Sequence, residues 1–218
     1  MMNATYLKKT CSRQEVYHIL AKSRGKQIMT TVAIPSWNVL GLLPPIDSKI
    51  PTSPDRSPYC VSLKDVVMRF ATTLERRNVL SGFLKYRQAL HQLGFKSGFQ
   101  WLNGSFAEDV EMIEKRPPHD MDVVTFLHTP EHFVLSDKDM KIFNNDYAKS
   151  HFSVDAYIVE LDELSSDQIV IHSAYWYSMW SHRRNQAWKG FLQIELDPAE
   201  DTEAIAWLDQ FEPTGAIL

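Results

Sequence analysis

The sequence has few cysteines and no long apolar run. Its two cysteines, Cys11 and Cys60, stand far apart and lack the spacing of a zinc site, so we expect a reduced protein without disulfides. No apolar run approaches the roughly 18 residues of a membrane span. The first residues also lack the charged and apolar regions of a signal peptide. Together these absences predict a cytoplasmic protein with no membrane partner.

Several motifs of well-known enzyme classes are missing as well. The chain has no Gly-x-x-x-x-Gly-Lys phosphate loop and no Gly-x-Ser-x-Gly nucleophile elbow. His119 and His128 flank an apolar segment, but no His or Cys pattern around them suits zinc. Any chemistry must therefore come from another set of residues, and the acidic ones stand out.

Charge is divided unevenly along the chain. Residues 1–100 hold 15 Lys/Arg and 5 Asp/Glu, whereas residues 101–218 hold 8 and 22, which together give the net charge of -4. A basic first half suggests a surface for a polyanion such as RNA. The alternative is that the two halves neutralise each other through contacts within the molecule. Sequence alone leaves both interpretations open.

The order of the predicted strands and helices indicates an α/β (α+β) fold, with helices packed on a small sheet. We expect a basic extension at 1–33 and one domain at 34–218, with helices at 62–93, a catalytic core at 99–196 and an acidic tail at 197–218. Six prolines exclude regular helix or central strand between residues 34 and 58. The predicted strands are 99–103, 120–127, 152–161 and 190–196, and further helices are predicted at 106–114, 136–148, 169–182 and 204–211. Basic side chains are expected on the outer faces of the helices at 62–93, either solvated or facing RNA: Arg69, Arg76, Arg77, Lys85 and Arg87.

Three aspartates stand inside apolar, strand-forming segments. Asp120 and Asp122 alternate along one predicted strand, so both side chains point to the same face. Asp155 lies in the next predicted strand, 152–161, within the apolar run Val154 to Val159. An ionised carboxylate in such a position is costly unless it is paired or binds a metal. Three carboxylates at the ends of neighbouring strands predict a site for Mg²⁺ or Mn²⁺.

These residues resemble a known superfamily. Gly104-Ser105 after a strand, a spacer, Asp120-x-Asp122 and a third aspartate on a later strand resemble the polymerase-beta-like nucleotidyltransferases. Four segments resemble an uncharacterised bacterial family within that superfamily, so that the likeness spans residues 34–196: Gly41 to Pro45, Asn103 to Phe106, Pro118 to Val124 and Trp188 to Gly190. The resemblance implies a nucleotidyltransferase fold, with helices packed on a small mixed, largely antiparallel sheet. It also implies transfer of NMP from an NTP, ATP included, to an acceptor.

The resemblance also implies roles for single residues. Gly104 would let the backbone approach the phosphates, with Ser105 and a following helix N-terminus as donors. Asp120, Asp122 and Asp155 would hold the metal ions, and Asp155 would help to deprotonate the acceptor hydroxyl. Arg183, Arg184 and Lys189 either clamp the triphosphate or form a basic loop that neutralises the acidic half. Aromatic side chains nearby either stack on a base or pack into the core: Tyr175, Trp176, Tyr177, Trp180 and Trp188.

Three functions remain open at this stage. The first is a metal-dependent nucleotidyltransferase that acts on an RNA end such as tRNA, a protein or a small molecule, in a toxin–antitoxin or phage-defence (antiviral) setting. The second is a catalytically silent nucleotide- or RNA-binding module, or an antitoxin-like partner protein. The third is a metal-dependent nuclease that uses the same carboxylates. Neither the base, the acceptor nor the oligomeric state follows from the sequence.

Overall fold

The computed structural model describes residues 31–131, 133–134, 136 and 139–210. The predicted extension at 1–33 therefore lies almost entirely outside the described residues, as does the end of the acidic tail. Within the described ranges, none of the helices combines the length and apolar character that crossing a membrane requires.

A five-stranded sheet forms the centre of the domain, in the order β1-β5-β2-β3-β4. The strands are β1 (Tyr59–Cys60), β2 (Gly98–Asn103), β3 (Met121–Leu127), β4 (Val154–Glu160) and β5 (Leu192–Glu195). Strand β2 pairs antiparallel with β3 and β5, whereas the outer pairs β1–β5 and β3–β4 are parallel. The predicted mixed α/β fold is confirmed, and the two-residue edge strand β1 is an addition to it.

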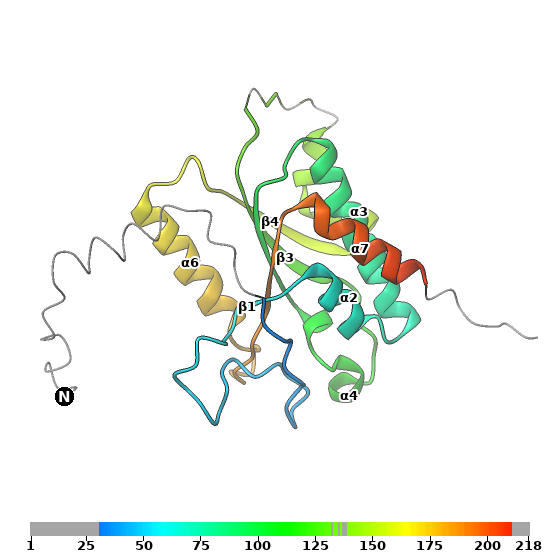
Figure 1. The fold of residues 1–218 in the computed structure, drawn as a ribbon, viewed down its shortest axis with the longest axis vertical. Coiled ribbons are helices and arrows are strands. Elements are labelled where there is room, and N and C mark those ends of the chain that lie inside the picture. The colour runs from blue at the N-terminus through cyan, green and yellow to red at the C-terminus, as the bar shows by residue number, and fades with distance from the viewer. Residues whose placement is uncertain (1–30, 132, 135, 137–138, 211–218) are drawn as a thin grey trace, which may run out of the picture. The chain divides into compact units, whose positions relative to one another are not determined.

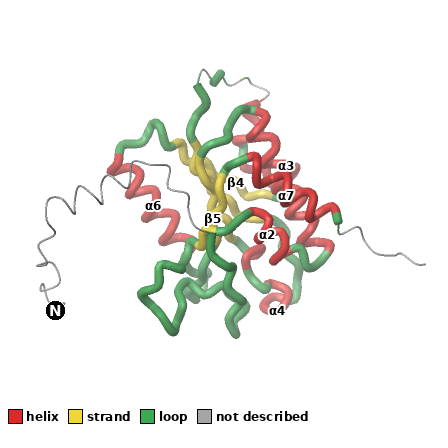
Figure 2. Tube along the Cα trace, in the orientation of Figure 1, coloured by secondary structure: helices red, strands yellow, loops and turns green. Residues whose placement is uncertain are grey.

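Helices cover both faces of this sheet (Figures 1 and 2). On one face α2 (Leu63–Phe70), α3 (Leu74–Gln92), α5 (Asn145–Phe152) and α7 (Pro198–Asp209) enclose the larger core. On the other face α6 (Ser166–Trp180) packs Trp176 and Trp180 against Trp101, Val124 and Phe126. Because strand side chains alternate, Val123 and Ala156 point into the larger core, while Asp122 and Asp155 point to the α6 face.

Capping side chains set the helix boundaries, and some of the predicted boundaries are wrong. Ser62 caps α2 by accepting a hydrogen bond from the Asp65 N–H, as predicted. The single helix predicted at 136–148 is instead a 3₁₀ turn η3 (Asp139–Phe143) followed by α5, because extended Asn144 interrupts it and caps α5. The helix predicted at 106–114 is likewise split into η2 (Ser105–Ala107) and α4 (Val110–Glu114), with Asp109 as the cap of α4. The last helix starts earlier than expected, with Asp197 as its cap and Pro198 in its first turn.

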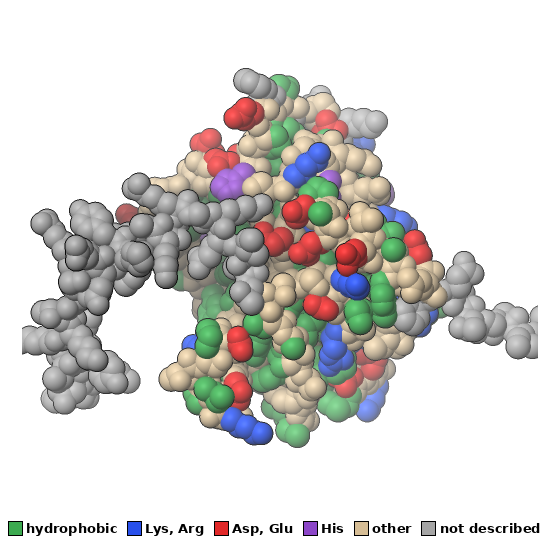
Figure 3. Space-filling view, viewed as in Figure 1, with side chains coloured by type: hydrophobic (Ala, Val, Ile, Leu, Met, Phe, Trp, Pro, Cys, Tyr) green, Lys and Arg blue, Asp and Glu red, His purple; other side chains and the backbone are tan. Residues whose placement is uncertain are grey.

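Two of the arginines expected on outer helix faces are buried, so that expectation was wrong for them. Arg76 is 1% exposed and pairs with Glu111 at 2.7 Å, and Arg87 is fully buried. Arg87 Nη2 lies 2.7 Å from Asp201 Oδ1, and its Nη1 donates to Gln100 Oε1. On the face that carries α2 and α7, basic and acidic side chains lie side by side (Figure 3), and Lys64 there pairs with Glu203 at 3.2 Å. In these pairs the basic first half neutralises the acidic second half.

The buried ion pair between Arg87 and Asp201 predicts a large loss of stability when one partner is removed. Arg87→Met should lower the free energy of unfolding by about 3–5 kcal/mol, because Asp201 would stay buried without its strongest partner. Lys64→Met, which removes the exposed pair with Glu203, should cost about 1 kcal/mol or less. Urea unfolding of both variants measures the difference, and equal losses would contradict the prediction.

The same carboxylate predicts a pH dependence of stability. Burial raises the pKa of Asp201, but hydrogen bonds from His91 and Arg87 and their charges outweigh it and hold the pKa below its usual value. The stabilisation is therefore complete above the unfolded-state pKa of about 3.9 and is lost as the pH falls through the folded-state value. The difference in melting temperature between the wild type and Asp201→Asn should shrink as the pH falls below about 4. A difference that grows as the pH falls from about 4 to 2 would contradict this assignment.

Candidate functional site

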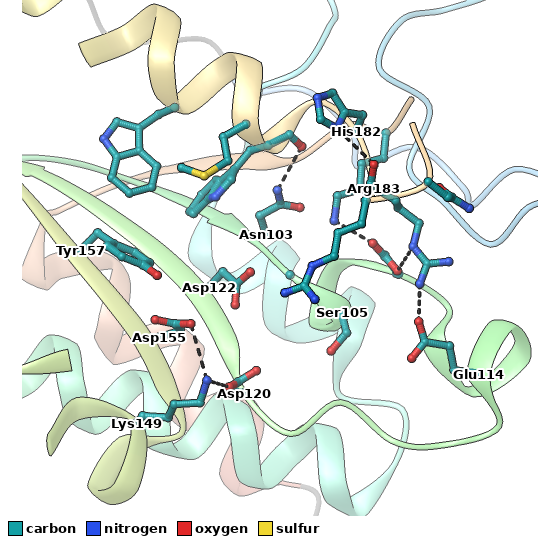
Figure 4. Close-up of a pocket in the computed structure, with 18 of the residues that line it drawn as sticks. Asn103, Ser105, Glu114, Asp120, Asp122, Lys149, Asp155, Tyr157, His182 and Arg183 are labelled. Carbon is teal, nitrogen blue, oxygen red and sulfur yellow. Dashed lines mark hydrogen bonds and ion pairs between the residues drawn. The ribbon is translucent and has the colours of Figure 1, made fainter. Parts of the chain in front are cut away.

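A cavity of about 860 Å³ opens on the α6 face of the sheet, where β2 ends and β3 and β4 begin. All eight residues that the sequence analysis selected line this one cavity: Gly104, Ser105, Asp120, Asp122, Asp155, Arg183, Arg184 and Lys189. Figure 4 shows the three aspartates grouped on one side of the cavity and Arg183 on the opposite side. The fold thus brings together residues as far apart in the chain as Gly104 and Lys189.

Strand register places the aspartates side by side. Asp122 on β3 is the direct partner of Asp155 on the parallel strand β4 and of Asn103 on the antiparallel strand β2. Asp120 precedes β3 by one residue and points to the same cavity. The acidic end of the cavity is therefore built by the sheet itself rather than by flexible loops.

Gly104 provides the space for the Asp122 carboxylate. It has a φ of 79°, and a Cβ placed on it would lie 2.8 Å from Asp122 Cγ and 2.9 Å from Oδ1. A residue with a side chain would be strained by that φ and would also collide with the carboxylate. Gly104 was predicted to let the backbone approach phosphates. In the structure, its missing side chain lets the end of β2 lie close to the Asp122 carboxylate.

At the acidic end of the cavity, burial and neighbouring negative charges disfavour the ionised form of Asp122. The pKa of Asp122 is raised to about 6, first by burial and then by the charges of Asp155 and Asp120, while Lys189 and Lys149 act in the opposite direction. Lys149, on α5, places its Nζ 2.8 Å from Asp120 Oδ2 and 3.5 Å from Asp155 Oδ2. A hydrogen bond to Asp120 raises the pKa of Lys149 in turn, so that its ammonium stays protonated.

The opposite end of the cavity is basic. Lys189 is buried and its Nζ donates to Glu108 Oε1 at 2.7 Å. Arg183 pairs with Glu108 at 3.3 Å and also with Glu114. Arg116 pairs with Glu114 at 2.7 Å, which makes a network of two glutamates and three cations. Lys189 and Arg183 are thus already neutralised within the protein, as the alternative of a basic loop in contact with acidic residues predicts.

Arg184 differs from these two residues. Its side chain is exposed and lines the same cavity. Within the described ranges of the chain it forms no ion pair. Of the three basic residues selected from the sequence, Arg184 is therefore the one free to meet an anionic ligand.

The cavity as a whole is electrically polarised. At the acidic end, three aspartates and Lys149 leave a formal charge of -2 when all are ionised. The other charged residues that line the cavity are Glu108, Glu114 and four cations, which leaves +2. These four cations are Arg116, Arg183, Arg184 and Lys189. Such a cavity complements a divalent cation at one end and an anion at the other.

The aromatic residues divide between the core and the cavity wall. Trp176 and Trp180 are buried in the core beneath α6, which is the packing alternative, although both also line the cavity. Tyr157, which follows Asp155 on the same face of β4, lines the cavity beside them (Figure 4). Tyr175 and Trp188 are exposed.

Several residues of the site were given no role on the basis of the sequence. Lys149 and Asn145 lie one helical turn apart on α5, and Asn145 Nδ2 donates to Asp155 Oδ1 at 2.6 Å. Glu108 stands in a short acidic segment with no periodic pattern to mark it. Asn103 belongs to a segment quoted for the resemblance, yet it received no role. Its Nδ2 donates to the Trp180 carbonyl at 3.1 Å, while its buried Oδ1 has no hydrogen-bond partner among the described residues.

The donor chemistry of the acidic end fits a hard divalent cation. Its carboxylates are the ligands that Mg²⁺ and Mn²⁺ prefer, and the unpartnered Asn103 Oδ1 adds a neutral oxygen nearby. Among the described residues, no three His, Cys, Asp or Glu side chains are already arranged as a metal-binding group. One expected donor is also missing, because Ser105 begins a three-residue 3₁₀ turn and not a helix.

Comparison with known proteins places the chain in one family. Residues 35–195, which are 161 of the 218, match a family described as "Family of unknown function (DUF6932)". No curated protein and no solved structure matches the chain. These comparisons do not link the chain to the polymerase-beta-like superfamily, so that resemblance stays a prediction. The chain belongs to the DUF6932 family.

Proposed function

We propose that this protein is a metal-dependent nucleotidyltransferase that transfers NMP from an NTP to an acceptor. The observation that carries the proposal is the polarised cavity, whose acidic end suits a divalent cation and whose basic end suits phosphate. A metal–nucleotide complex has the same distribution of charge. A volume of about 860 Å³ also lies within the range of pockets that hold small molecules.

The residues would divide the work as follows. Asp120, Asp122 and Asp155 would hold Mg²⁺ or Mn²⁺, which when bound would neutralise phosphate charge and lower the barrier to attack. Gly104 and Ser105 lie beside this group and would contact the phosphates. Arg184 would pair with the outer phosphates, because its guanidinium has no ion pair within the described part of the chain.

The transfer step requires one bond to form and one to break. An acceptor hydroxyl oxygen would bond to the α-phosphorus, the bond from the α-phosphorus to its bridging oxygen would break, and pyrophosphate would leave. Asp155 would accept the hydroxyl proton, with Asn145 holding its other oxygen. Catalysis of this kind depends on positioning and electrostatics more than on covalent chemistry.

We keep the acceptor open among an RNA end such as tRNA, a protein side chain and a small molecule. Burial of Arg76 and Arg87 removes two residues from the basic surface that tRNA would need. A role in a toxin–antitoxin or phage-defence system, and a cytoplasmic location, are part of the same proposal and rest on resemblance alone.

One observation favours the second candidate, a catalytically silent nucleotide-binding module. Lys149 already contacts two of the three carboxylates, as a protein cation would in a site that has lost its metal. Calorimetry separates the two functions. NTP binding that is indifferent to Mg²⁺ and to Asp120→Asn favours the silent module, and binding that needs both favours the enzyme.

The proposed function predicts label transfer that depends on Asp122. Purified protein is incubated with Mg²⁺ or Mn²⁺, each labelled NTP, and bulk tRNA or protein. Asp122→Asn should reduce the rate of label transfer about 100-fold or more, because it removes a charge at the centre of the acidic end. Asp55→Asn makes the same chemical change at an exposed position outside the cavity and should leave the rate unchanged.

Three outcomes bear on this prediction. Transfer that survives Asp122→Asn would contradict the proposed function, and the absence of transfer from every NTP with either metal would exclude tRNA and protein as acceptors. Shortening of the RNA instead of its extension would identify the metal-dependent nuclease. Label in tRNA or in protein that Asp122→Asn abolishes supports the enzyme and names the acceptor.

Gly104 predicts a loss of activity that exceeds its effect on stability. Gly104→Ala and Gly94→Ala both place a side chain at a positive φ, of 79° and 96°, and each should cost about 1–3 kcal/mol of stability. Only at Gly104 would the new Cβ displace the Asp122 carboxylate, since the nearest atom to a Cβ at Gly94 is Pro130 Cγ at 3.2 Å. Label transfer should therefore fall in Gly104→Ala and persist in Gly94→Ala; equal activity in the two variants would argue against a role for this contact.

A further inference from the structure

Lys149 occupies the acidic end of the cavity in a specific way. It projects from α5, and its Nζ lies 2.8 Å from Asp120 Oδ2 and 3.5 Å from Asp155 Oδ2 (Figure 4). A single ammonium thus lies between carboxylates of residues 35 positions apart in the chain. The lysine side chain is 50% exposed, so packing does not fix it in this position.

The remaining contacts of the aspartates show which oxygens this ammonium takes. Asp155 Oδ1 accepts a hydrogen bond from Asn145 Nδ2, which also donates to the Ala156 carbonyl. Asp155 Oδ2 is therefore the oxygen left for a cation, and it is the one that faces Lys149. A metal bound by Asp155 would therefore compete with the ammonium for Oδ2, and on Asp120 it would share the carboxylate that Lys149 already contacts.

Among the described residues, Lys149 is the one cation in direct contact with the acidic end of the cavity. Lys189 and Arg183, which line the opposite end, are paired with Glu108 and Glu114. Without Lys149, the carboxylates of Asp120, Asp122 and Asp155 would repel one another with no cation in direct contact among the described residues. A protein cation at this place keeps the three side chains together before any metal arrives.

We propose that Lys149 is an internal counter-ion that competes with the divalent metal for Asp120 and Asp155. The inference rests on the proposed function, since it assumes that these carboxylates bind metal. Metal binding would break both contacts of Lys149 and turn its ammonium toward solvent or toward an anionic part of the substrate. Because the side chain is half-exposed, this release is inexpensive, and Lys149 weakens metal binding without preventing it.

The test is a titration of the full chain with Mn²⁺ alone, in the absence of nucleotide, followed by electron paramagnetic resonance. Lys149→Met should bind Mn²⁺ about fivefold more tightly than the wild type, because the competing charge is gone. Lys64→Met is the matched control, since Lys64 is a similarly exposed lysine with a carboxylate partner at 3.2 Å, away from the cavity. It should bind Mn²⁺ as the wild type does.

A second measurement guards against variants that are merely less well folded. Without metal, Lys149→Met should melt at a lower temperature than the wild type, because the carboxylates repel each other. Saturating Mn²⁺ should raise its melting temperature more than that of the wild type, and Lys149→Arg, which keeps the charge, should behave like the wild type.

Different results overturn different claims. An unchanged or weaker affinity for Mn²⁺ in Lys149→Met would overturn the competition, and so would an affinity in Lys149→Arg as high as in Lys149→Met. If label transfer nevertheless depends on Asp122, the proposed function stands and only the role of Lys149 fails. If neither the wild type nor any variant binds Mn²⁺, the proposed function fails together with this inference.

Discussion

The mutual repulsion of three carboxylates is the constraint on which the rest of the site depends. Asp122 and Asp155 are direct partners on parallel strands, and Asp120 stands one residue before the first of these strands. The sheet fixes their backbones, so that the side chains cannot move far apart. Their charge must be balanced locally, by protonation of Asp122, by Lys149 or by a metal. A metal at this place would support nucleotidyl transfer. The proposed role of Lys149 is to balance the same charge when no metal is bound.

Much of the fold was predictable because its elements carry local signals. Short apolar, strand-forming runs indicated β2, β3 and β4, and Ser62 indicated the start of α2. The signals failed for the single helix expected at 136–148, because Ser136 and Asn144 each cap a separate element: Ser136 Oγ accepts from the Asp139 N–H at η3, and the Asn144 side chain accepts from the Tyr147 N–H at α5. They also failed for Arg76 and Arg87, because helical periodicity does not show that a basic side chain will be buried against a partner distant in the chain.

The acidic residues of the candidate site were predictable for the same reason, and their partners were not. An aspartate inside an apolar strand is conspicuous, so Asp120, Asp122 and Asp155 could be selected from the sequence and are found in one cavity. Lys149 looked like any lysine on a polar helix face, and only the packing of α5 beside β4 brings it to the carboxylates. The engagement of Arg183 and Lys189 with Glu108 was equally hidden, because these residues lie more than seventy positions from that glutamate.

The central claim is that one cavity holds a metal and a nucleotide together. The most direct measurement is a crystal structure of the protein with Mn²⁺ and a non-hydrolysable NTP analogue, with the metal located by anomalous scattering. We predict an anomalous peak among the carboxylates of Asp120, Asp122 and Asp155, with the phosphates extending toward Arg184 and Lys149 withdrawn from the aspartates. A nucleotide bound elsewhere, or an acidic end in which Lys149 keeps both contacts and no Mn²⁺ appears, would contradict the claim.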